Sequence, residues 1–271
     1  MVGENSMDNL LNEYITQKQL LVEAIVEKDY MQIYESFSLK NDFVLKLGEP
    51  RYKLHKIEIT IARTKLKLDM LETCIKLKVP IDIEQIDKHL DKEFEKHDSM
   101  LKSMKKEIDS VHNLDNEDLF LISNVKELKK VYFSIACYVH PELSDSADKN
   151  AKRIWKAAKK AYENGDVAKL KRLQKKVQNE YRDILPNEGN PKTDLENMVS
   201  SMKSKREEVL SEIERLKKQF PFNEAKMLGD QDAIIKFKKD IDLDIKVAKE
   251  LLDKLEKQVL EKLPAPSRFL N

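Results

Sequence analysis

Residues 52–78 carry apolar side chains at alternating steps of three and four, and this spacing constrains the fold more than any other feature. Such a heptad seam lies on one face of an α-helix and packs against a neighbouring helix. The seam has one polar member and consists of Leu54, Ile57, Ile61, Thr64, Leu68, Leu71 and Ile75. A second apolar stripe on the same run predicts contact with more than one neighbour. It consists of Ile59, Ala62, Leu66, Met70 and Leu77.

Four further runs have helical spacing, at about residues 8–47, 83–112, 194–219 and 230–263. Gly48–Pro50 predicts the end of the first run, and residues 79–82, "VPID", predict a break after the second. These short loops predict antiparallel packing of consecutive helices. The last run again carries a seam, made of Ile234, Ile241, Ile245, Ala248, Leu252, Leu255 and Val259.

Composition supports an all-α fold of long antiparallel, coiled-coil-like helices. Glycine occurs only 5 times and proline 8 times, while 37% of the 271 residues are charged. Alternating strand patterns between tight turns are missing. We expect a long-helix region at residues 1–113, a smaller module at 114–185 and a helical hairpin at 186–271 that packs on the N-terminal helices. The linker between the last two is "LPNEGNPK", residues 185–192.

Several function classes lack support in the sequence. The 50 basic and 49 acidic residues nearly cancel, so no global field draws the protein to nucleic acid or membrane. The chain has no phosphate-binding glycine loop, catalytic triad or Cys-x-x-Cys pair, so we expect no enzymatic activity and no cofactor. Cys74 and Cys137 fit buried thiols in a reducing compartment. Without a signal-like start or an apolar membrane span, we expect a cytoplasmic protein.

The module contains two helical stripes around a His-Pro-Glu sequence. The first stripe consists of Leu128, Val131, Tyr132, Ile135, Ala136 and Val139, and the second of Ile154, Trp155, Ala158, Ala161 and Tyr162. Pro141 cannot extend the first helix and places His140 in extended backbone. Gly165 predicts the end of the second helix, and Asp166 can cap the next one.

These residues resemble the J-domain family over about 50 residues. J-domains have a second helix of the form L-K-K-x-Y-x-x-L-A-x-x-x-H-P-D, followed by a loop and a third helix with an Ala-Tyr pair. The matching residues are Leu128, Lys129, Lys130, Tyr132, Ile135, Ala136, His140, Pro141, Ala161 and Tyr162. We therefore call residues 114–185 the J-like module.

The resemblance implies binding to a 70-kDa heat-shock chaperone, because the His-Pro-Asp loop and the basic second helix of J-domains stimulate its ATP hydrolysis. Here the implied contact residues are His140, Pro141, Glu142, Lys126, Lys129 and Lys130. Two departures weaken this expectation. Glu142 replaces the aspartate, and the helix ends in Phe133, Ser134, Cys137 and Tyr138 where active relatives are basic.

The first helix of the J-like module also departs from the family. Residues 117–125, "EDLFLISNV", are short and lack the usual Tyr-Leu-Gly pattern. We expect the helical run at 83–112 to supply the missing packing.

Positive charge gathers after the His-Pro-Glu sequence. Residues 149–176 contain eleven lysines or arginines and two acids. The basic patch that we single out consists of Lys152, Arg153, Lys156, Lys159, Lys160, Lys171 and Arg172. It could bind nucleic acid or an acidic protein, although solvated basic helices are common. His89, Glu93 and His97 share a helical face, but one helix supplies only part of a metal site, so we expect no metal.

Three function classes remain open. The first is a co-chaperone that acts through its His-Pro-Glu loop, and the second is a chaperone-related adaptor or scaffold that has lost this activity. The third is a nucleic-acid-binding protein that uses the basic patch. The depleted basic face favours the second class over the first. The heptad seams suit pairing within one chain or within a homodimer, and no membrane partner is expected.

Overall fold

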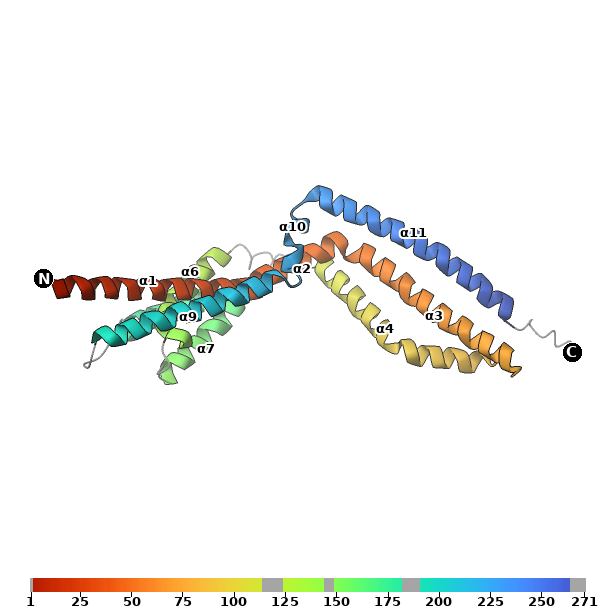
Figure 1. Ribbon diagram of the computed structural model, residues 1–271, viewed down its shortest axis with the longest axis horizontal. Helices are drawn as coiled ribbons and strands as arrows, with labels where there is room; N and C mark the ends of the chain where they lie inside the picture. The colour runs from red at the N-terminus through yellow and green to blue at the C-terminus, as the bar shows by residue number, and fades with distance from the viewer. Residues whose placement is uncertain (1, 114–123, 144–148, 182–190, 264–271) are drawn as a thin grey trace. The chain divides into compact units, whose positions relative to one another are not determined.

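The structure is a computed structural model that describes residues 2–113, 124–143, 149–181 and 191–263. Every regular element in these ranges is helical, which confirms the all-α fold (Figure 1). No described helix is long and apolar enough to cross a membrane. The expected linker at 185–192, the start of the module and the C-terminal tail lie mostly or wholly outside the described residues.

The chain forms two compact units. The first contains Met1–Leu39 and Asp115–Asn223, and the second contains Lys40–Leu114 and Glu224–Asn271. These units cut across the three consecutive regions drawn from the sequence. The N-terminal helices contribute to both units. The two long C-terminal helices pack on different N-terminal helices. Helix α9 (Pro191–Lys217) packs on α1 (Val2–Tyr30), and α11 (Gln231–Lys262) packs on α3 (Glu49–Leu77).

The backbone stays helical from α1 to α3, so the predicted break at Gly48–Pro50 is wrong. Between them lie the π-helical segments η1 (Met31–Glu35) and η2 (Val44–Gly48), separated by α2 (Ser36–Phe43). Pro50 lacks an N–H group, and its ring crowds the carbonyl of Lys46. The wider π turn of η2 ends two residues before Pro50 and includes Lys46, so it accommodates both effects.

The second unit is built on the seam of α3. This helix ends at Leu77, and Asp82 caps α4 (Ile83–His112) by accepting a hydrogen bond from the Gln85 N–H at 3.0 Å. Figure 1 shows α3 between α4 and α11. The shared core contains Ile59, Ile61, Leu68, Leu71, Ile86, Leu90, Phe94, Leu255 and Val259. Part of each predicted seam therefore packs in one core within the chain, namely Ile61, Leu68 and Leu71 of α3 with Leu255 and Val259 of α11. The last member of the α3 seam, Ile75, is 48% exposed.

The first unit combines α1 with the J-like module and α9. The module contributes α6 (Val125–Val139), the 3-10 turn η3 (Pro141–Leu143), α7 (Lys149–Glu163) and α8 (Val167–Glu180). Along α1, α9 buries its own apolar stripe, which consists of Leu195, Val199, Met202, Val209 and Ile213. The turn η4 (Phe222–Glu224) and the short α10 (Ala225–Leu228) then lead to α11.

Candidate functional site

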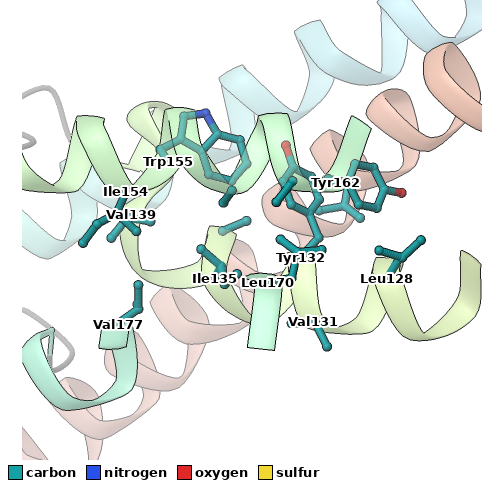
Figure 2. Packing of buried hydrophobic residues seen from close by; sticks show 14 of the residues in the cluster. Leu128, Val131, Tyr132, Ile135, Val139, Ile154, Trp155, Tyr162, Leu170 and Val177 are labelled. Atoms are coloured by element: carbon teal, nitrogen blue, oxygen red, sulfur yellow. The ribbon is translucent and has the colours of Figure 1, made fainter. Parts of the chain in front are cut away.

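The core of the J-like module is a stack of three aromatic rings from α6 and α7 (Figure 2). The Tyr132 ring lies between Trp155, with ring centroids 5.0 Å apart, and Tyr162, at 4.1 Å and nearly parallel. All members of the two stripes predicted for α6 and α7 are buried, which confirms them. Leu170 and Val177 of α8 complete the core, and Asp166 caps α8 through the Lys169 N–H at 2.8 Å.

Helix α1 supplies the packing that we expected from the run at 83–112. Val22 and Val26 of α1, with Tyr34 of η1, belong to the core of the J-like module. The buried residues of α4 belong to the cores of the second unit, so that expectation is wrong. The reason is that Val22 and Val26, one turn apart on α1, pack in the same core as the apolar stripe of α6.

A buried polar contact fixes α1 on α6. The Tyr132 hydroxyl donates to Asp29 Oδ2 at 2.8 Å, and Asp29 is only 7% exposed. Burial, with the Asp29 carboxylate, raises the pKa of Tyr132, so the phenol stays protonated as a donor. The Tyr34 hydroxyl donates to the Tyr162 carbonyl, and burial raises the pKa of Tyr34 to about 12.

The His-Pro-Glu loop, residues 140–142, is a structured turn at the end of α6. His140 adopts extended backbone, with φ −68° and ψ 133°, as the following proline requires. Its Nδ1 accepts a hydrogen bond from the Glu142 N–H at 3.1 Å, and its carbonyl accepts one from the Leu143 N–H. The imidazole meets Trp155 edge-on, with ring centroids 4.4 Å apart.

The His140 imidazole is neutral at physiological pH. Burial lowers its pKa to about 4, and three nearby ammonium groups add to the shift. They belong to Lys28, Lys159 and Lys205. A neutral ring with Nδ1 as an acceptor carries its proton on Nε2. His140 is therefore a fixed part of the turn rather than a group that changes its charge near pH 7.

Helix α9 contacts the His-Pro-Glu loop through Lys205. The Lys205 Nζ donates to the Glu142 carbonyl at 3.0 Å and lies 4.0 Å from the Glu142 carboxylate. Leu143, directly after the loop, packs against the cores on both sides, that of the J-like module and that of α1 with α9. The loop is thus held by a helix from outside the J-like module.

The three lysines predicted on α6 face α1. The Lys129 ammonium pairs with Glu27 and lies 4.6 Å from the centre of the Tyr30 ring. Lys126 and Lys130 are exposed. Together with Lys129 they line a groove of about 520 Å³ between α6 and α1. The other lining residues are Glu23, Val26, Glu27 and Phe133. Acidic groups of α1 therefore neutralise part of the basic face of α6.

The basic patch is exposed at every position. Lys171 of α8 pairs with Glu127 of α6 at 2.5 Å. Within the described residues, no carboxylate lies within 4 Å of the ammonium groups of Lys152, Lys156, Lys159 or Lys160. The α7 part of the patch is therefore available to a partner, and the α8 part is partly neutralised.

The metal-site candidate stays on one exposed helical face. His89, Glu93 and His97 lie on α4, and His97 contacts the Phe94 ring. Among the described residues, no three histidine, cysteine or acidic side chains are placed to hold a metal ion. Cys74 and Cys137 are half-buried thiols.

Three residues that hold the J-like module from outside were not predicted from the sequence: Glu27 and Asp29 on α1, and Lys205 on α9. A signal for α1 was present, because Val22, Val26, Asp29 and Ile33 repeat at steps of four, three and four. Nothing distinguishes Lys205 from the other lysines of its helix. Its role follows from the packing of α9 on α1.

Comparison with protein-family models, with curated proteins and with solved structures gave no match. The J-domain resemblance therefore stays a prediction carried by the residues of α6, the His-Pro-Glu loop and α7.

Proposed function

We propose that this protein is a non-enzymatic, chaperone-related adaptor in which the J-like module docks a partner rather than stimulating a 70-kDa chaperone. The module keeps the helix pair and the His-Pro-acid turn of the family it resembles. Two residues of the surface that would meet a chaperone, Lys129 and Glu142, instead contact other helices of the chain. The J-like module would then dock its partner through a different face.

The observation that carries this proposal is that both halves of the expected chaperone contact touch other helices of the protein. Lys129 pairs with Glu27 of α1, and Glu142 accepts the Lys205 ammonium of α9. A chaperone that bound the loop and α6 together would have to displace these contacts. Ion pairs between partly exposed groups contribute about 0–1 kcal/mol each, so the attached helices hinder access more than the pairs do.

The late positions of α6 support the same conclusion. Phe133, Cys137 and Tyr138 are half-buried and pack against the core of the J-like module. An active second helix would present cations there to the chaperone. The end of α6 next to the loop therefore has little charge with which to attract that partner.

Single-turnover ATP hydrolysis by a 70-kDa heat-shock chaperone tests the proposal. The full chain is titrated to saturation beside the His140→Gln variant, with an active J-domain as the positive control. We expect the native chain to leave the hydrolysis rate within about twofold of the basal rate, a difference of less than about 0.5 kcal/mol in barrier height. An acceleration that the His140→Gln variant loses would make the protein a co-chaperone and overturn the proposal.

A further inference from the structure

The outward side of α7 is a continuous cationic face. At about 100° per residue, its cations fall within roughly 120° of the helix circumference, opposite the buried stripe. We define the cationic face as Lys149, Lys152, Arg153, Lys156, Lys159 and Lys160. Glu163, one turn beyond them, is the acidic residue on the same side of α7. All seven side chains are exposed.

We propose that the cationic face of α7 binds the phosphate backbone of a nucleic-acid duplex. The face spans about 17 Å along the helix axis, because eleven steps of 1.5 Å separate Lys149 from Lys160. Over that length a duplex presents about ten phosphate charges. Lys152, Lys156 and Lys160 follow one another at intervals of about 6 Å along the helix axis, so several ammonium groups reach the same stretch of phosphate backbone.

An acidic protein is the weaker candidate, because the cationic face has no apolar anchor. Protein interfaces place aromatic and apolar side chains at their centre and are depleted in lysine there. The apolar residues of α7 point the other way, into the core of the J-like module (Figure 2). Contacts made by lysine and arginine alone are typical of phosphate binding without base recognition.

A duplex also fits better than a single strand. Proteins that bind single strands stack the bases on exposed aromatic rings. Trp155 is 9% exposed and Tyr162 is fully buried, so neither ring of α7 is offered to a base. Duplex binding needs no such platform, since the phosphates lie on the outside.

This inference rests on the proposed docking role and names its partner. The test is fluorescence anisotropy of the full chain with a labelled mixed-sequence duplex of about 20 base pairs, at salt concentrations from about 50 to 200 mM. One variant replaces Lys152, Lys156, Lys159 and Lys160 with glutamine. The matched control replaces four exposed lysines of α11, namely Lys236, Lys238, Lys239 and Lys246, with glutamine. Both variants lose the same net charge.

We expect the α7 variant to bind the duplex at least tenfold more weakly at low salt, with a salt slope smaller by about 3 to 4. The α11 variant should stay within about twofold of the native affinity, because a charge change alone alters only the weak long-range field. Circular dichroism should show that both variants keep their helices.

Three results would overturn the inference: no duplex binding at low salt, equal weakening by the two variants, or tighter binding of poly-glutamate than of the duplex. The last would assign the cationic face to an acidic protein. None of these results depends on the chaperone assay, so failure of the duplex inference is distinguishable from failure of the proposed adaptor role.

Discussion

At the scale of single residues, His140 shows how burial and neighbouring charges fix the protonation state of a residue in a tight turn. Its backbone bends as the proline requires, and its Nδ1 accepts the Glu142 N–H. Three ammonium groups and the edge-on Trp155 ring surround it. A protonated imidazole would lose the acceptor at Nδ1 and would face three positive charges. The folded state therefore selects the neutral ring.

This selection predicts a pH dependence of stability. The imidazole pKa is about 6.5 in the unfolded chain and about 4 in the folded protein, so the unfolded state binds more protons between these values. The contribution of the neutral His140 to the free energy of unfolding should be fully present above about pH 6.5. The free energy of unfolding should then fall by up to about 3 kcal/mol as the pH drops toward 4. Urea unfolding at a series of pH values measures it.

The His140→Gln variant is the matched control for this measurement, because glutamine can still accept the Glu142 N–H but does not titrate. Carboxylates also titrate in this range in both proteins, so the difference between the two curves isolates the histidine. The native curve should fall more steeply than that of the variant. Parallel curves would show that His140 is not held neutral.

At the scale of elements, Gly48 shows that one sequence pattern, glycine followed closely by proline, can occur in two different backbone structures. Glycine followed closely by proline is typical of a helix end, yet it also occurs where a glycine faces a neighbouring helix and proline sits in the first turn. Gly48 has helical dihedrals, φ −61° and ψ −50°. A Cβ there would lie 3.3 Å from Ile108 Cγ1 and 3.3 Å from Val44 Cγ1. The glycine therefore permits the close approach of α4.

A large side chain at this position should force α4 away. We expect Gly48→Leu to lower the free energy of unfolding by about 2 kcal/mol, despite the better helix propensity of leucine. Ala62→Leu, at an exposed position of α3, should stay within about 0.5 kcal/mol of the native protein. Urea unfolding compares the two variants. In the Gly48→Leu background, Ile108→Ala removes the obstructing side chain and should recover part of the lost free energy of unfolding. A Gly48→Leu protein as stable as the native one would contradict the close approach.

The elements that could be predicted are those with a period and a stop signal of their own. The stripes of α6 and α7 are buried where the spacing placed them, because burial of one helical face follows directly from the pattern. On α11 four of the seven seam residues are buried, namely Ile234, Ile241, Leu255 and Val259. The cap Asp166 also follows from local chemistry. The break at Gly48–Pro50 failed, because its outcome depends on a helix far away in the sequence.

At the scale of the whole molecule, the sequence left open which seam pairs with which. A heptad seam predicts that a helix packs against another helix, but it does not identify that helix. The answer decides the function proposed here, because pairing α9 with α1 brings Lys205 to the His-Pro-Glu loop. Charge reinforces the arrangement: α1 carries six acidic residues and two lysines, so its Glu27 can pair with Lys129 of α6.

The central claim is that α1 and α9 of the same chain contact Lys129 and Glu142, two residues that the J-domain resemblance assigns to a chaperone contact. Carbodiimide crosslinking with mass spectrometry tests it directly, because this reagent joins an ammonium group and a carboxylate that are already in contact. An equal mixture of unlabelled and nitrogen-15-labelled protein separates bonds within a chain from bonds between chains. Lys262 and Glu72, 3.0 Å apart in the second unit, form the reference pair.

We predict crosslinks between Lys129 and Glu27 and between Lys205 and Glu142, both within one chain and with yields comparable to that of the reference pair. Efficient crosslinking of Lys262 to Glu72 without either of these products would show that the loop and the basic face of α6 are uncovered in solution. That result would contradict the central claim.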